Sequence, residues 1–472
     1  MTPNHASDRI EPPAAPRRQL TLLDSTSIIV GIVIGSTIYQ SSPLIANQVP
    51  STAWLIGVWL LGGFLSLVGA LCYAELANAY PTEGGDYAYL TQGFGRTVGM
   101  LFAWIQFWIV RPGSIGTLAY VFAQYANQLC PLGDGPWPLV VYAVGAIVLL
   151  SGVNLLGIRE GKWTQNVLTI VKFLGLAAIV VAGFCSKPAA AIALPAEPHQ
   201  FNLDSFAFAM ILIFYAYSGW NEMAYVGSEV RDPAKNILRA LLLGTVAVAV
   251  LYILVTLAFV YALGFEGLRH SQAVAVDVVR PALGPWGSRL ISTLICISAL
   301  GAINGMIFTG SRIYYAMGTE HRLFAWLGHW DARREAPIRT LLIQAAVTVA
   351  LTIGFGLNEK GFENSVIFTA PPFWIFLFLT GLTVFVLRLN DPDRPRPYRV
   401  PLYPVTPMIF CISSGFMIYK SLTYAYAMQP FWVVVSLGVA VVGLLLSLFD
   451  AEMKGPGDHP GKNWSPLSPG EG

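Results

Sequence analysis

The sequence predicts an all-α integral membrane protein of twelve transmembrane helices. Of its 472 residues, 55% are apolar and only 11% are charged, which is less than half the charged share usual in a soluble domain. Apolar runs of at least 18 residues recur along the whole chain, and each is long enough to cross a hydrocarbon core of about 30 Å. The lipid bilayer is therefore the expected surrounding of nearly the whole chain.

The apolar runs, read against the charge clusters between them, place the helices in order. We expect them at residues 25–48, 52–78, 97–127, 138–156, 165–184, 205–228, 237–263, 290–317, 338–355, 365–389, 407–425 and 431–449. The membrane domain thus covers residues 25–449. The polar, Pro-rich residues 1–24 and the Pro-, Gly- and Ser-rich residues 450–472 lack a periodic apolar face, so we expect both to be disordered.

Basic residues between the helices predict the orientation of the chain. An even number of spans puts both termini on one side of the membrane. The termini and the loops on their side hold 20 of the 28 Lys and Arg residues. Because cytoplasmic loops carry the excess of Lys and Arg, we expect both termini to be cytoplasmic and the protein to lie in a bacterial-type cell membrane.

Small residues interrupt the first and the sixth helix near mid-depth: Gly31, Gly35, Ser36 and Thr37 in one, and Ser218 with Gly219 in the other. These helices begin two successive sets of five, which predicts a five-plus-five inverted repeat with broken helices 1 and 6. Half-helix ends offer N–H groups to a carboxylate and carbonyls to an ammonium, so a zwitterionic amino acid fits both. Close packing of helices through Gly and Ser is the alternative interpretation.

Five segments in order, at helix ends, carry a resemblance to a known family. They are Gly31–Tyr39 (GIVIGSTIY), Pro81–Tyr89 (PTEGGDYAY), Tyr215–Asn221 (YAYSGWN) with Glu229–Asn236 (EVRDPAKN), Ala299–Gly305 with Ser311 and Arg312, and Arg394–Pro401 (RPRPYRVP). Over residues 20–425 the chain resembles the amino acid–polyamine–organocation (APC) superfamily, and within it most closely the L-type amino acid transporters. The resemblance implies a sodium-independent secondary transporter or exchanger of amino acids that works by alternating access.

The resemblance also implies the site. Ser36 and the backbone of Thr37 would receive the substrate carboxylate, and the amine would go to carbonyls of three residues: Val33, Tyr215 and Ser218. Tyr215 would be the gate over the site. The same motifs place the other expected binding residues at Gly35, Tyr217, Gly219 and Asn221. Three residues differ from those of the family, namely Thr37, Tyr215 and Phe373, so the resemblance leaves the identity of the amino acid open.

Lys172 stands in the middle of the fifth apolar run, where an isolated ammonium is energetically unfavourable and usually functional. In the family a lysine here takes the place of a sodium ion between helices 1, 5 and 8. We therefore expect Lys172 to bridge helix 1 to helix 5 and to act as the coupling residue, able to exchange a proton during the cycle.

Arg111 lies within the third helix, one residue before a proline that frees a backbone carbonyl. Its charge must face protein or a water-filled cavity. In the family the corresponding position varies with substrate class, which implies a substrate-binding arginine that favours an acidic side chain. The alternative is a structural ion pair with a helix carboxylate such as Glu222, and the sequence leaves both interpretations open.

Other function classes have little support. A net charge of +2 gives no reason to expect nucleic-acid binding, and the five cysteines and six histidines form no metal-binding or redox pattern, so no cofactor or metal is expected. No cluster of catalytic residues indicates an enzyme. The alternatives to an amino acid transporter are a carrier of amines, polyamines or another organic ion, and a sensor that binds amino acids without moving them. The sequence indicates no particular protein partner.

Overall fold

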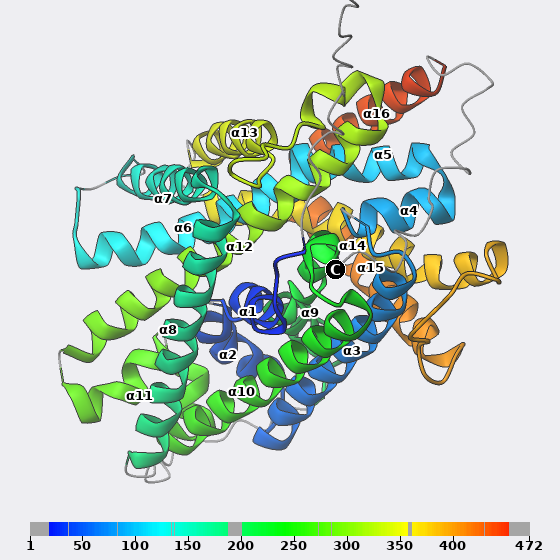
Figure 1. Cartoon of the computed structure of the whole chain (residues 1–472). Coiled ribbons are helices and arrows are strands. Elements are labelled where there is room, and N and C mark those ends of the chain that lie inside the picture. The colour runs from blue at the N-terminus through cyan, green and yellow to red at the C-terminus, as the bar shows by residue number, and fades with distance from the viewer. Residues whose placement is uncertain are drawn as a thin grey trace, which may run out of the picture.

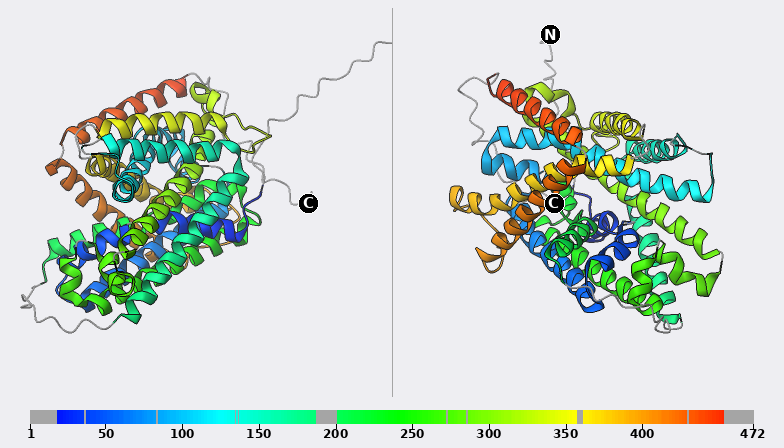
Figure 2. Two further views of the ribbon diagram at one scale, coloured as in Figure 1. Left: turned by 90° about the vertical axis from the view of Figure 1, so that its left-hand side faces the viewer. Right: turned by 180° about the vertical axis from the view of Figure 1, so that it is seen from behind.

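The computed structural model describes residues 18–35, 37–82, 84–133, 135, 137–186, 201–271, 273–284, 286–356, 361–428 and 430–452. Within them the regular elements are helices, with two isolated β-bridges besides (Figure 1). The long helices run side by side across the molecule, as the turned views show (Figure 2). This arrangement confirms the predicted all-helical fold class.

The element order repeats once along the chain. The first set consists of α1 (Leu22–Val33) with α2 (Thr37–Gln48), α3 (Thr52–Ala79), the short α4 (Asp86–Phe94), α5 (Arg96–Ile105) with η1 (Gln106–Val110) and α6 (Arg111–Leu129), α7 (Trp137–Leu156) and α8 (Ile158–Cys185). The second set consists of α9 (Leu203–Tyr217) with η2 (Trp220–Glu229), α10 (Pro233–His270), the short α11 (Val274–Leu283), α12 (Trp286–Glu320), η3 (Arg322–Leu327), α13 (Ile338–Gly356) and α14 (Gly361–Asn390).

Two further helices, α15 (Val405–Met428) and α16 (Pro430–Glu452), follow the two sets. Each set starts with a broken helix and continues with a long helix and a short one. With its broken helix counted as one span, each set crosses the membrane an odd number of times. An odd number of spans turns the second set upside down relative to the first, as in the inverted repeats of secondary transporters.

Eleven of the described helical segments are long and apolar enough to cross a membrane. The sixth predicted span is not among them, because α9 has only 15 residues before its break. Length and composition alone therefore support eleven of the twelve predicted spans, and the twelfth is the helix that the sequence predicted to be interrupted.

One predicted boundary was wrong and another was right, each because of a glycine. The fifth helix begins at Ile158 rather than at residue 165, since Gly157 has a φ of 142° and turns the chain directly from α7 into α8. The seventh predicted helix ends at residue 263 as expected, because Gly264, with a φ of 73°, breaks α10 there before a short helical segment continues to His270. Both conformations favour glycine over residues with a Cβ.

The start of α1 is fixed by its own cap and by η2. Thr21 and Asp24 form a capping box, which satisfies N–H groups that a helix start leaves free. Ahead of the cap, the N–H groups of Gln19 and Leu20 donate to the carbonyl of Glu229 at 2.8 Å. The two broken helices are thus tied together at one end by backbone hydrogen bonds.

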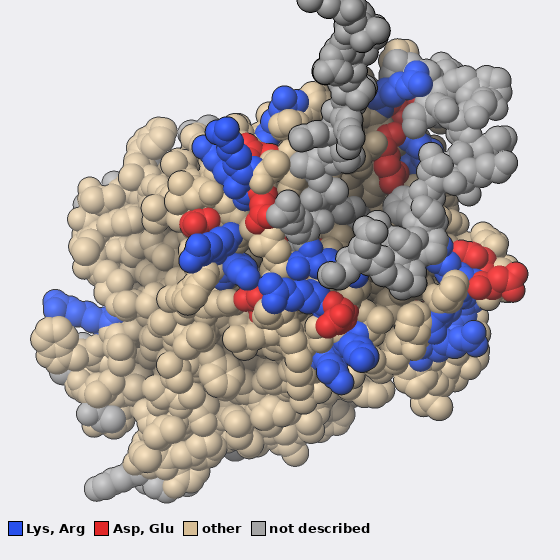
Figure 3. Space-filling view, in the orientation of Figure 1, with Lys and Arg blue, Asp and Glu red and all other residues tan. Residues whose placement is uncertain are grey.

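Charged side chains gather in one part of the face that Figure 3 shows. Figure 3 shows Lys, Arg, Asp and Glu in a band across its centre and upper right, beside a large uncharged area at the lower left. An uncharged surface of this kind suits lipid tails, in which a charged side chain is costly.

Candidate functional site

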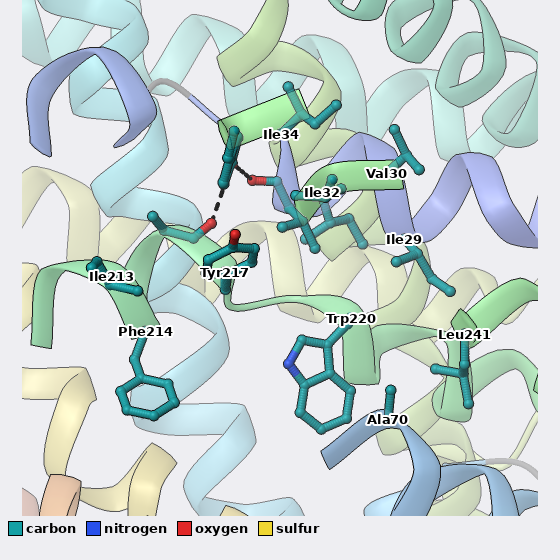
Figure 4. Close-up of a cluster of buried hydrophobic side chains, with 14 of the residues drawn as sticks. Ile29, Val30, Ile32, Ile34, Ala70, Ile213, Phe214, Tyr217, Trp220 and Leu241 are labelled. Atoms are coloured by element: carbon teal, nitrogen blue, oxygen red, sulfur yellow. Dashed lines mark hydrogen bonds between the residues drawn. The ribbon is translucent and has the colours of Figure 1, made fainter. Parts of the chain in front are cut away.

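The two helix breaks lie against each other in the interior. α1 ends at Val33 and α9 ends at Tyr217, and Gly219 adopts a φ of 110° just before η2 begins. Figure 4 shows Tyr217 and Trp220 on the two sides of the unwound segment, with Ile32 and Ile34 near it. The sequence placed both breaks correctly, and at the second one Gly219 adopts a conformation that a regular helix excludes.

Local hydrogen bonds stabilise the second break. The Ser218 hydroxyl donates to the carbonyl of Tyr215 at 2.8 Å, and its N–H points to the same carbonyl at 3.3 Å. From α10, the Tyr252 hydroxyl donates to the carbonyl of Val33 at 2.7 Å and lies 3.3 Å from that of Ala216. Tyr252 therefore links the two breaks, a role that the sequence did not reveal because a tyrosine in an apolar run resembles any aromatic core residue.

A cavity opens beside the second break. Its walls come from the break itself and from α6, η1, α12 and α14: Gln106, Val110, Arg111, Ser114, Tyr215, Ser218, Gly219, Asn221, Glu222, Tyr225, Met306, Thr369, Ala370, Phe373 and Trp374. A second cavity shares Ser218, Asn221, Phe373 and Trp374 with it and extends toward α3 and α15. Both combine aromatic walls with a few polar groups, as small-molecule sites usually do.

The cavity contains five of the predicted binding residues: Arg111, Tyr215, Ser218, Gly219 and Asn221. Val33, Gly35 and Thr37 lie at the first break but are not among the described residues that line the cavity. Ser36 lies outside the described residues. Tyr217 points away from the cavity, since its hydroxyl donates to the carbonyl of Trp59 at 3.2 Å in the buried core.

Arg111 makes a buried ion pair. Its Nη1 lies 2.8 Å from Glu222 Oε2, and only 3% of the Arg111 side chain and 7% of the Glu222 side chain are exposed. Thr309 donates a second hydrogen bond to the same carboxylate oxygen, and the guanidinium lies over the Tyr225 ring at 5.3 Å. Arg111 Nε has no hydrogen-bond partner among the described residues. The structural alternative foreseen for Arg111 is thus present, on the wall of the cavity.

Lys172 fills a cage of carbonyl groups. Its ammonium, in a residue 1% exposed, donates to the carbonyls of Gly31, Ile34 at 2.9 Å and Ser298 at 3.0 Å. These carbonyls belong to the first broken helix and to α12. The ammonium therefore joins three segments in the way a small cation would, by meeting oxygen atoms that the helix break leaves free.

Gly219 provides a direct test of the break. A Cβ at this position would lie 2.7 Å from Ile32 Cγ2, and a φ of 110° strains any residue with a side chain. We expect Gly219→Leu to abolish substrate binding, because a substrate must approach bare backbone there. Binding would be measured by ligand-induced thermal stabilisation of the purified protein.

Gly152→Leu is the matched control, since a Cβ at Gly152 on α7 would meet no atom within 4 Å. It should bind substrate like the wild type. Unchanged affinity in the Gly219→Leu protein would show that close approach to this backbone is not required.

Comparison with known proteins bears on what the cavity holds. Residues 20–445 match a family model described as amino acid permease. The chain is 30% identical over 415 residues to the b(0,+)-type amino acid transporter 1 of Homo sapiens, across 85% of this chain and 82% of that protein. It is 31% identical over 425 residues to the large neutral amino acids transporter small subunit 2 of Homo sapiens, across 86% and 76% of the two chains.

Proposed function

The chain belongs to the amino acid permease family, and we propose that it carries α-amino acids through the cavity at its two helix breaks by alternating access. This family consists of membrane transporters, not enzymes. The observation that carries the proposal is that the second break packs against the first, with Gly219 against Ile32, and forms part of the wall of a cavity.

The half-helix ends suit the two charges that all α-amino acids share. α2 and η2 begin at the breaks, and a helix N-terminus favours a carboxylate. α1 and α9 end there, so their last carbonyls are available to an ammonium. In our proposal Ser36 and Thr37 receive the carboxylate, and the carbonyls of Val33, Tyr215 and Ser218 receive the amine. The Val33 carbonyl accepts from the Tyr252 hydroxyl and from the Gly35 N–H, each at 2.7 Å, so the amine would replace one of these two donors.

We propose that transport does not need sodium. The ammonium of Lys172 already meets three carbonyl oxygens between the first broken helix, α8 and α12. A sodium ion at this place would have to displace a cation that is covalently part of the chain.

The orientation in the membrane follows from the distribution of Lys and Arg between the loops. We propose that both termini lie in the cytoplasm and that the protein lies in a cell (inner) membrane.

Counterflow in proteoliposomes tests the proposal. Vesicles holding the purified protein and an unlabelled amino acid would receive a panel of labelled amino acids, in sodium or in choline buffer. We expect uptake of at least one α-amino acid at the same rate in both buffers. Binding without uptake would instead identify a sensor, uptake of amines that lack a carboxylate would identify an amine carrier, and a need for sodium would contradict the role of Lys172.

A further inference from the structure

One buried acidic residue differs from all the others. Six carboxylic acids are buried among the described residues: Asp24, Glu75, Asp86, Glu222, Glu229 and Asp450. Five of them contact a basic side chain, respectively Lys162, Arg388, Arg111, Arg312 and His321. Asp86, only 3% exposed, forms no ion pair with any described residue. A buried carboxylate without a cation is unfavourable, and such a group is readily protonated.

The backbone of the α4 start forces Asp86 into this position. Asp86 is the first residue of α4 and follows Gly84 and Gly85, whose φ values are 82° and 47°. A Cβ at Gly85 would lie 2.8 Å from the backbone carbon of Ala224 in η2. Only a glycine at position 85 lets this loop come so close to η2, and the Asp86 carboxyl group that follows is buried.

Two side chains connect Asp86 to the cavity. The Tyr225 hydroxyl donates to Asp86 Oδ2 at 2.5 Å, and the Asn221 side-chain amide donates to the Tyr225 oxygen at 3.5 Å. Both Tyr225 and Asn221 line the cavity in which we place the substrate. A hydrogen-bonded path therefore runs from the cavity wall to a carboxyl group that forms no ion pair with any residue the structure describes.

The groups around Asp86 do not compensate for its burial. Facing it are Tyr73 of α3, Tyr89 of α4, Tyr225 and Glu222 of η2, and Thr380 of α14. None of these is a cation, and Asp86 Oδ1 has no hydrogen-bond partner in the described part of the chain. Burial, followed by the nearby Glu222 charge, raises the pKa of Asp86 from 3.8 to about 6, although three hydroxyl groups act in the opposite direction.

Charged side chains on α5, α6 and α12 are engaged with other groups. Arg96 donates to the backbone carbonyl of Glu320, and the Glu320 carboxylate accepts a hydrogen bond from Tyr87 at 2.8 Å. Arg111 faces Glu222 and the Tyr225 ring. No basic side chain among the described residues pairs with Asp86, so a proton is the cation that can neutralise its carboxylate.

We propose that Asp86 is a proton-binding site of the transport cycle, loaded from the cavity through Tyr225 and emptied when η2 moves away from α4. The proposal rests on the proposed function. In loading, the Tyr225 hydroxyl passes its proton to Asp86 Oδ2 while the Tyr225 oxygen takes a proton from a hydronium ion in the cavity, so a neutral acid forms and a water molecule remains. In emptying, its O–H bond breaks and the proton passes to water on the side of α4.

The difference between the pKa of Asp86 in the packed state and in water shows how proton binding is coupled to the movement of η2. With α4 and η2 packed together, the pKa of Asp86 is about 6, whereas a hydrated aspartate has its ordinary 3.8. Proton binding therefore stabilises the packed state below about pH 6, and loss of the proton favours separation of the two elements. The proton is taken up from the cavity in the packed state and is released on the side of α4 on opening. It therefore moves in the same direction as an amino acid that is carried from the cavity toward that side.

The test measures proton movement and amino acid counterflow separately. Proteoliposomes of the full chain would enclose a pH-sensitive dye, and the amino acid found to be transported would be added outside. We expect the wild type to acidify the lumen upon substrate addition, and its uptake to change with pH around a midpoint near 6. Asp86→Asn should lose the acidification and the pH dependence while counterflow continues, because the amide still accepts the Tyr225 hydrogen bond.

Asp391→Asn is the matched control, since Asp391 accepts a hydrogen bond from Tyr80 at 2.9 Å but is partly exposed. It should acidify the lumen like the wild type. Acidification that persists in Asp86→Asn would overturn the proposal. If that variant does not fold, wild-type uptake without acidification and without change between about pH 5 and 8 would overturn it equally. A wild type that moves no amino acid at all refutes the proposed function instead.

Discussion

A Lys172→Met protein is expected to insert into the membrane but to lose up to about 99% of its amino acid transport. Met keeps an unbranched apolar stem of similar length and removes the charge. The carbonyls of Gly31, Ile34 and Ser298 then lose their shared donor. An unpaired buried polar group costs about 1–3 kcal/mol, and a loss of about 3 kcal/mol in the transport-competent state is roughly a 100-fold change.

Lys162→Met gives the control for this experiment, on the same helix. Lys162 pairs with Asp24 at 3.4 Å and is 20% exposed, so its loss should change transport by no more than about twofold. Counterflow in proteoliposomes, normalised to the amount of inserted protein, measures both variants. Normal turnover in Lys172→Met would show that the ammonium is dispensable.

The sequence allowed Lys172 to be singled out, but not its partners. An isolated lysine in an apolar run is conspicuous, and so are Gly and Ser inside two corresponding helices. The contribution of Ser298 comes from a different helix, and hydrogen bonds between distant segments leave no local pattern. The same holds for Tyr252, which joins the two breaks.

Asp86 shows a different limit of sequence reasoning. It lies within a recognisable motif, yet a carboxyl next to a Gly-Gly pair looks like any turn residue. What distinguishes it is the lack of a basic partner among the described residues, which only a three-dimensional arrangement reveals. Glu229 is the opposite case, because this helix-end residue is fully buried beside Arg312 at 2.7 Å.

The Arg111–Glu222 pair is expected to control both folding and the charge preference of the site. The two side chains together offer the cavity no net charge, so the wild type should prefer amino acids with neutral side chains. Each single neutralisation leaves the partner buried and unpaired, which typically destabilises by about 3–5 kcal/mol. We expect Arg111→Gln and Glu222→Gln each to lower the folded yield, measured by size-exclusion chromatography of detergent-purified protein.

Competition assays on the folded fraction separate a selectivity role from a purely structural one. Arg111→Gln leaves the Glu222 carboxylate on the cavity wall, so lysine should compete better against the labelled substrate and glutamate worse. Glu222→Gln frees the Arg111 guanidinium, whose Nε already lacks a partner among the described residues, and should shift competition the opposite way. The shifts are opposite because the exposed charges are opposite.

The double variant Arg111→Gln/Glu222→Gln completes a double-mutant cycle with the two single variants. It removes both charges together, so no uncompensated ion remains and the folded yield should recover most of the loss of either single variant. The wild-type preference for neutral side chains should return with it. If the yield follows this pattern while the competition order of lysine, leucine and glutamate never changes, the pair is structural only. Arg111 would then play no part in the choice of amino acid.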